Sequence, residues 1–252
     1  MTKSAKQASP LAQAGGEALL TISGVSKNFG GVKALTDVSF QVKEHSVTSL
    51  IGPNGAGKTT LFNCITGFAS GDVGTVIFDD IDITKKPGHK VARLGMVRTF
   101  QSIRMLRDLT VFESFLCARS NAGASYKQQV AKAEELIARL NLTEVANRKC
   151  STLPLLAQRT IEVGRALMTS PKMILLDEPT AGATTAERDL LAQLIGELKA
   201  QGTTVMVIEH NVPFVMDVSD HIVVLNFGQV VADGTPEEVA NNQIVQEVYL
   251  GV

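Results

Sequence analysis

The sequence feature that most limits how this chain can fold is the stretch Gly52-Pro53-Asn54-Gly55-Ala56-Gly57-Lys58-Thr59. It follows a short run of β-branched and aliphatic residues, 47–51, which predicts a strand, and residues 59–68 after it predict a helix. A strand that enters a helix through such a turn matches the phosphate-binding loop motif in full. This context argues against the alternative, a glycine-rich turn with a chance lysine.

The residue types in this loop suit phosphate chemistry. Glycines allow a tight backbone whose N–H groups point at the β- and γ-phosphates from a helix N-terminus. Lys58, also a candidate catalytic residue, places a positive charge there, and the Thr59 hydroxyl can ligate Mg²⁺. We therefore expect ATP and Mg²⁺ as cofactors. The predicted nucleotide-binding residues are Gly52, Pro53, Asn54, Gly55, Ala56, Gly57, Lys58, Thr59 and Thr60.

A second, acidic segment supports the same chemistry. Residues 173–176 predict a buried strand that runs straight into Asp177 and Glu178. An aspartate at a strand end beside a phosphate loop can hold Mg²⁺, and Glu178 would then orient or deprotonate the attacking water. The alternative is an acidic surface pair before a turn at Pro179. Two parts of one mechanism agree, which favours the catalytic interpretation.

Three further residues are weaker candidates when each is taken alone. His210 follows the predicted strand 203–208 and could contact the γ-phosphate, although a lone histidine after a strand is more often structural. Gln101 lies where the α/β core meets the predicted helical segment, and its side chain could contact Mg²⁺ or the attacking water. The ring of Phe29 could stack on adenine, and the alternative is an ordinary core phenylalanine.

The remaining pattern is α/β with one helical interruption, at about 102–164, where apolar residues such as Ala133 and Ile137 recur at helical spacing. Strands alternate with helices on both sides, which implies a mostly parallel sheet, and residues 222–231 predict a hairpin. We expect a mobile tail at 1–16 and a single domain at 17–252. The predicted fold is an α/β P-loop NTPase core at 17–101 and 165–252, with N-terminal antiparallel strands and an inserted helical subdomain at 102–164.

Charge and composition exclude some other classes. The chain has 24 basic and 25 acidic residues, so its balance favours no nucleic-acid partner. Its three widely spaced cysteines form no metal-ligand motif, and the general tendency of free cysteine predicts that each packs in the core of a reduced, cytosolic protein. The N-terminal residues lack the apolar stretch of a secretory signal. No apolar run is long enough to span a bilayer, so we expect any membrane role to come through a partner.

These residues, in this order, resemble the ATP-binding subunits of ABC transporters from about Leu19 to Val252. Within that superfamily the chain looks most like the ATPases of branched-chain amino-acid uptake systems. The narrower resemblance rests on residues 95–101 (Gly-Met-Val-Arg-Thr-Phe-Gln), 109–114, 208–211 and 233–236, and on Tyr249-Leu250-Gly251.

The resemblance implies the ABC ATPase fold and a role for each weaker candidate. Phe29 would be the adenine-stacking aromatic, and Gln101 would be the Q-loop glutamine that contacts the metal and couples nucleotide state to the membrane subunit. Glu178 would be the catalytic carboxylate and His210 the switch histidine. Two ATPase chains would sandwich two ATPs head to tail beneath membrane-embedded permease subunits. The expected location is therefore peripheral, on the cytoplasmic face of the inner membrane, with a solute-binding protein as an indirect partner.

One departure from the family pattern lies at its signature motif, usually Leu-Ser-Gly-Gly-Gln. The aligned stretch here is Leu153-Pro154-Leu155-Leu156-Ala157. Pro154 lacks the hydroxyl and N–H of the serine, and Leu156 puts a side chain where a glycine lets a phosphate come close. We therefore expect a heterodimer with unequal sites, in which ATP facing Leu156 turns over slowly. The alternative is that a different backbone path around Leu155 and Leu156 still supplies N–H groups.

A second departure follows Ala181-Gly182, where the family usually continues with Leu and then Asp or Asn. Here the chain has Ala183 and Thr184, and Thr184 with Glu187 forms a predicted capping box.

Two rival functions stay open. A soluble ATP switch on nucleic acid or ribosomes would usually carry tandem ATPase units or basic extensions. A small-molecule kinase would use a substrate hydroxyl, whereas Glu178 directly after Asp177 suits water as the nucleophile.

Overall fold

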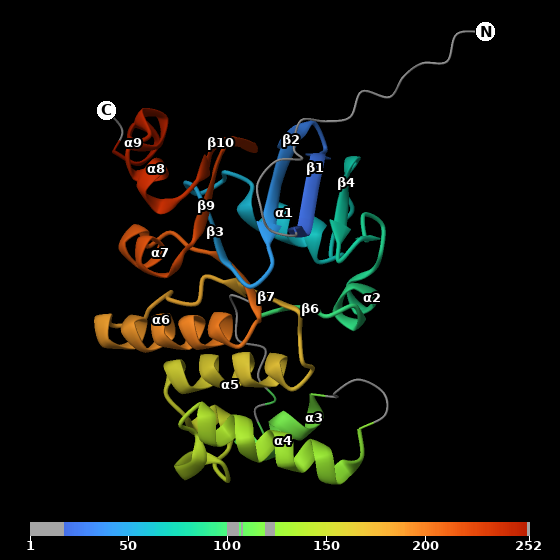
Figure 1. Ribbon diagram of the computed structural model, residues 1–252, viewed down its shortest axis with the longest axis vertical. Coiled ribbons are helices and arrows are strands. Elements are labelled where there is room, and N and C mark those ends of the chain that lie inside the picture. Colours follow the sequence, from blue (N-terminus) through green and yellow to red (C-terminus); the bar gives the residue numbers. More distant parts are fainter. Residues whose placement is uncertain (1–17, 100–105, 107, 119–123, 251–252) are drawn as a thin grey trace, which may run out of the picture.

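The computed structural model describes residues 18–99, 106, 108–118 and 124–250. Figure 1 shows two sheets side by side at one end of the molecule and a group of helices, α3, α4 and α5, at the other. The predicted tail at 1–16 and the predicted site residue Gln101 lie outside the described residues.

The first sheet is antiparallel and lies in the N-terminal part of the chain. Its strand order is β2-β1-β4-β5, formed by β1 (Ala18–Phe29), β2 (Val32–Lys43), β4 (Val73–Phe78) and β5 (Ile81–Asp82). Leu20 and Ile22 alternate along β1 and are fully buried. This period of two is typical of a strand with one face in the core, and the predicted N-terminal antiparallel strands are confirmed.

The main sheet is parallel except at one edge. It comprises β3 (Val47–Ile51), β6 (Met96–Arg98), β7 (Met173–Asp177), β8 (Thr204–Ile208), β9 (His221–Asn226) and β10 (Gln229–Gly234), in the order β10-β9-β3-β8-β7-β6. The β9–β10 pair is the predicted antiparallel hairpin. Every residue of β3, β7 and β8 is buried, as expected for central strands covered on both faces.

Helices cover both faces of this sheet. The helices in the described part of the chain are α1 (Lys58–Ile65), α2 (Gly88–Arg93), α3 (Val111–Cys117), α4 (Tyr126–Arg139), α5 (Leu155–Leu167), α6 (Thr185–Ala200), α7 (Val212–Val218), α8 (Pro236–Ala240) and α9 (Gln243–Leu250), with short 3₁₀ turns at Thr143–Val145 and Cys150–Thr152. None of the helices in the described part of the chain combines the length and apolar character needed to cross a bilayer.

The predicted helical subdomain does contain α3, α4 and most of α5, which lie together in Figure 1. Its core is shared, however, because Phe115 and Ile137 belong to the same buried cluster as Leu191 of α6 and Ile174 of β7. Helix α5 also runs across the predicted division between residues 164 and 165. The division into core and subdomain therefore stays a prediction, and no break in packing marks it.

Two expectations from the sequence need correction. Helix α1 ends at Ile65 rather than at Phe68, because Gly67 adopts a left-handed backbone conformation with φ of 73°. Cys64 and Cys150 are buried as predicted, whereas Cys117 is exposed. Cys117 lies one helical turn after exposed Glu113, on the face of α3 turned away from the core, whereas its neighbours Leu116 and Ala118 pack against the core. Its position on the helix therefore outweighs the general tendency of cysteine.

Candidate active site

The order of strands in the main sheet brings the predicted site residues to one edge. β3, β8 and β7 are parallel neighbours, so their carboxyl ends meet at the same edge of the sheet. β3 leads into Gly52, β8 leads into Glu209 and His210, and β7 ends at Asp177 directly before Glu178. The histidine strand thus lies between the phosphate-loop strand and the acidic strand, an order that the motifs alone did not determine.

The loop between β3 and α1 has a backbone that only glycine can follow. A Cβ on Gly52, whose φ is 154°, would lie 2.2 Å from the carbonyl oxygen of Leu225. Gly57 is the N-cap of α1 with φ of 101°, and no side chain caps the N–H groups of the first turn. An uncapped helix N-terminus carries partial positive charge and donors, and Thr59 on that turn is exposed. This is the geometry of an anion site.

Lys58 lies inside the loop. Its side-chain Nζ donates to the carbonyl oxygens of Gly52 at 2.6 Å and Pro53 at 3.0 Å. Burial lowers the pKa of Lys58, and the nearby charge of Glu178 partly raises it again. This influence agrees with the strand order, which brings the ends of β3 and β7 to the same edge of the sheet.

Asp177 is held by an ion pair that the sequence analysis missed. Its Oδ2 accepts a hydrogen bond of 2.6 Å from Arg98 at the end of β6, and both side chains are almost fully buried. Arg98 also donates to Asn63 Oδ1 on α1 at 2.7 Å. The arginine therefore fixes the carboxylate relative to the helix that follows the phosphate loop. No local motif signals this pair, because its members are 79 positions apart.

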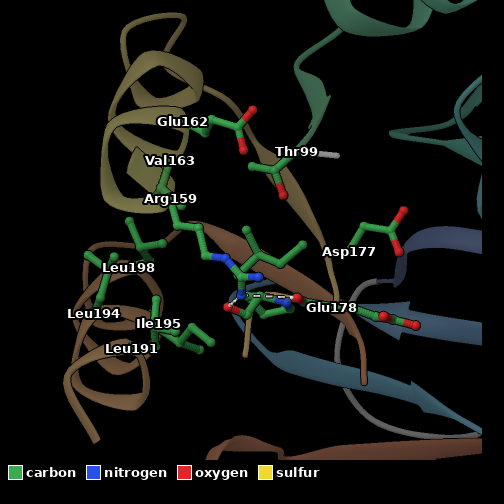
Figure 2. A pocket seen from close by; sticks show the side chains of 12 residues that line it. Thr99, Arg159, Glu162, Val163, Asp177, Glu178, Leu191, Leu194, Ile195 and Leu198 are labelled. Carbon is green, nitrogen blue, oxygen red and sulfur yellow. Dashed lines mark hydrogen bonds between the residues drawn. The ribbon is translucent and has the colours of Figure 1, made fainter. Parts of the chain in front are cut away.

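Glu178 has an unusual backbone. Its φ is 48°, a left-handed conformation that non-glycine residues rarely adopt, and its N–H donates to the Ile208 carbonyl oxygen at 2.9 Å. Figure 2 shows the Asp177 and Glu178 carboxylates directed away from Arg159, which reaches the same turn from α5. The small pocket drawn there, about 20 Å³, has room for a water but none for a nucleotide.

Three residues that surround the acidic turn were not among the predicted site residues, namely Arg159, Thr180 and Glu209. Arg159 on α5 donates to the backbone carbonyl oxygens of Glu178, Pro179 and Ala181. On the other side, fully buried Glu209 accepts hydrogen bonds from the N–H and hydroxyl of Thr180. His210, by contrast, has an exposed side chain, consistent with a role toward a ligand rather than in the core.

The candidate adenine-stacking residue also lies at the surface. Phe29 is 51% exposed at the end of β1, which rules out the alternative of an ordinary core phenylalanine. The ammonium group of Lys27 lies 5.2 Å from the centre of its ring. An exposed ring of this kind has a face that a base can cover. Gln101 is outside the described residues, so its predicted contact with the metal stays a prediction.

The stretch aligned with the signature motif forms the start of α5. Pro154 is the N-cap and makes no side-chain cap bond, so the first-turn N–H groups carry no side-chain partner at this cap. Leu156 packs partly against the core cluster around α5 and α6, while Leu155 is 47% exposed. The backbone here is a regular helix N-terminus. The alternative expected from the sequence therefore requires the N–H groups of this first turn to reach a phosphate past the Leu156 side chain.

Family models match the chain in two places. One described as "ABC transporter" covers residues 35–181, and one described as "Branched-chain amino acid ATP-binding cassette transporter" covers residues 229–252. The chain is 43% identical, over 92% of its length and 98% of the relative, to the high-affinity branched-chain amino acid transport ATP-binding protein BraF of Pseudomonas aeruginosa. It is 39% identical to LivG of Escherichia coli, with the same shares covered.

Solved structures agree with this assignment. A nucleotide-free ATP-binding cassette from an ABC transporter superposes with a TM-score of 0.85 at 37% identity, covering 94% of this chain and all of that one. The ADP conformation of an ATP-binding cassette gives the same values. The fold, the loop and these relatives together place the chain in the branched-chain amino acid transport family of ABC transporter ATP-binding proteins, the ATPases that couple ATP hydrolysis to transport.

Proposed function

We propose that this chain energises uptake of a branched-chain amino acid or a related small solute by hydrolysing ATP at the carboxyl edge of its main sheet. The supporting observation is the meeting of Lys58, Glu178 and His210 at the ends of β3, β7 and β8. Lys58 and the first-turn N–H groups of α1 hold the β- and γ-phosphates, and Phe29 stacks on adenine. Glu178 orients or deprotonates the attacking water, and His210 contacts the γ-phosphate.

Mg²⁺ fits the residues at this edge. Asp177 supplies one carboxylate and Thr59 one exposed hydroxyl, and no group of three metal-ligating side chains occurs in the described residues. Such a sparse set suits Mg²⁺, which keeps waters and takes phosphate oxygens as further ligands. The ion supplies charge neutralisation at the phosphates when bound. We assign Thr59 and Asp177 as its protein ligands, with Gln101 as the third.

The partners follow from the relatives. Their names describe amino-acid transport, and one structural relative is part of an ABC transporter complex. We propose that this chain docks on membrane-embedded permease subunits at the cytoplasmic face of the inner membrane and serves an external solute-binding protein through them. Nucleic acid has no place in this assignment, because the chain carries no net excess of basic residues.

The second ATPase subunit is proposed to be a different chain. In a head-to-tail pair, the start of α5 faces the ATP on the partner's loop, and here Leu156 stands in place of the close-approach glycine. A partner with an intact motif would complete the site at Gly52–Thr59 of this chain. The two sites would then turn over unequally.

Transport by the reconstituted complex tests the proposal. The complete transporter in liposomes should accumulate labelled leucine, isoleucine or valine only when ATP is supplied on the ATPase side. Glu178→Gln should keep ATP binding while lowering ATP hydrolysis and uptake about 100-fold or more, because it removes the carboxylate that acts on water. Uptake of small amides or aromatic acids instead would support ATP-driven transport by this complex and contradict the proposed solute class.

Composition of the ATPase pair tests the asymmetry. Mixing this chain with the second ATPase chain and ATP should yield a mixed dimer on size-exclusion chromatography, whereas this chain alone should stay monomeric. A homodimer of this chain that forms with ATP and hydrolyses it briskly contradicts the unequal-site proposal.

A further inference from the structure

The turn after the acidic strand keeps Glu178 in an unfavourable conformation. A positive φ of 48° is uncommon for a non-glycine residue, and such conformations persist only where the surroundings hold them. Glu178 is also the residue that the proposed mechanism needs at a defined position relative to the γ-phosphate. The contacts that hold this turn therefore bear on the chemistry as well as on the fold.

The α5 side of the turn is held by one arginine. The Arg159 guanidinium donates to the Glu178 carbonyl oxygen at 3.3 Å and also to the carbonyl oxygens of Pro179 and Ala181. Figure 2 shows it reaching from α5 to the backbone at Glu178. A guanidinium has several donors in a rigid plane, so one side chain can hold three carbonyls, which the ammonium of a lysine cannot do.

The opposite side of the turn is held by one carboxylate. Glu209 is 0% exposed, and its Oε1 accepts from the Thr180 N–H at 2.7 Å and the Thr180 hydroxyl at 2.6 Å. Its Oε2 accepts from the His210 N–H at 3.0 Å and the Asn211 N–H at 3.4 Å. A buried carboxylate is retained when its oxygens are hydrogen-bonded, and these bonds join the turn after Glu178 to the segment that carries His210.

The two holding groups also sense each other electrostatically. Burial lowers the pKa of Arg159, and the charge of Glu209 is the largest of the effects that raise it again. The guanidinium and the carboxylate therefore hold the turn from two sides, with Thr180 and the Pro179 carbonyl between them.

We propose that Glu209 and Arg159 are positioning residues for ATP hydrolysis: together they hold the turn that carries Glu178, and Glu209 keeps that turn in register with the backbone of His210. This inference rests on the proposed function. It adds a specific link, because Arg159 lies on α5, the helix that begins with the stretch aligned with the signature motif. The arginine therefore connects this helix to the backbone turn that carries Glu178 in the same chain.

Glu209→Gln in the assembled transporter is the principal test. The amide keeps the shape but replaces one acceptor oxygen by an NH₂ group, which then faces backbone donors. We expect kcat for ATP hydrolysis to fall about tenfold or more, because a small displacement of a catalytic group is costly, while the Kd for ATP stays within about twofold. Glu134→Gln, the same exchange at an exposed site on α4, is the matched control and should change neither.

Thr180 gives a test that survives poor folding of the buried variant. Thr180→Val removes only the hydroxyl donor to Glu209 and should lower kcat several-fold, whereas Thr180→Ser keeps the hydroxyl and should restore wild-type turnover. Arg159→Lys keeps the charge and should lower kcat without weakening ATP binding.

The outcomes separate the two proposals. Wild-type kcat in Glu209→Gln and Thr180→Val overturns the inference. So does a fall in kcat matched by an equal loss of ATP affinity, because that pattern indicates a general loss of structure. A wild-type complex that hydrolyses ATP but transports no solute refutes the proposed transport function and leaves this test in force.

Discussion

The N-termini of helices α1 and α5 differ in the residues that they offer to a phosphate group. Both α1 and α5 begin without a side-chain cap, so the donors of their first turns have no local side-chain partner. α1 follows a loop of glycines and starts with Lys58 and Thr59, whereas α5 follows Pro154 and starts with Leu155 and Leu156. The first presents charge and open backbone, and the second presents aliphatic side chains.

From this difference we expect that an uncapped helix end does not by itself make a phosphate site. The macrodipole and the N–H groups are common to both ends, and each is worth little without close approach. At α1 a missing Cβ allows that approach, and we propose that at α5 the Leu156 side chain opposes it.

Lys58→Ala should have the largest effect. Removing the loop cation should weaken ATP binding to this chain and lower hydrolysis by about 100-fold or more, because electrostatic stabilisation of the phosphates is the main contribution of the protein. Fluorescent-nucleotide titration and phosphate release measure the two quantities. Lys58→Arg, which keeps the charge, should lose less, and equal losses in both variants would contradict a simple charge role.

Leu156→Gly, alone and with Pro154→Ser, should act in the other direction. Opening the start of α5 should raise ATP turnover at the partner's loop several-fold, since backbone N–H groups gain access to that phosphate. Single-turnover hydrolysis is measured in a complex in which this chain also carries Glu178→Gln, so that the ATP on the partner's loop is the one hydrolysed. An unchanged rate would show that α5 already reaches the phosphate and would remove the ground for unequal sites.

Thr184→Ala should have a smaller effect, and one on stability. Helix α6 differs from α1 and α5 because Thr184 forms the predicted capping box with Glu187. Losing the cap should reduce the free energy of unfolding by about 1 kcal/mol without changing ATP affinity. Urea denaturation and nucleotide titration check both statements. A large loss of affinity would assign Thr184 a contact with nucleotide.

The pH dependence of binding should give the smallest effect. Because burial lowers the pKa of Lys58 from 10.5, ATP affinity should begin to fall at a pH below 10.5 as the unliganded lysine loses its proton. The same shift makes the unfolded state the stronger proton binder, so the protonated lysine opposes folding, and this cost diminishes as the pH rises toward 10.5. Isothermal titration between pH 7 and about 10 measures it. Lys58→Arg should flatten the curve, and an unchanged slope would contradict the assignment.

Much of the site could be predicted where residues adjacent in sequence act together. The loop Gly52–Thr59, the strand ending at Asp177 and the capping box at Thr184 were each readable from a short stretch, because backbone geometry and nearest neighbours decide them. The early end of α1 and the exposure of Cys117 were missed, because they depend on how a helix ends against its surroundings.

The phosphate loop, the acidic strand and the motif order of the family could all be read from the order of residues along the chain. The distant groups that support them became visible in the fold: Arg98 on Asp177, and Arg159 with Glu209 around the turn after Glu178. The physical reason is that loop motifs need a few consecutive dihedral angles. The buried Arg98–Asp177 ion pair and the hydrogen bonds of the Glu209 carboxylate, in contrast, form only once the order β3-β8-β7-β6 has placed separate strand ends side by side.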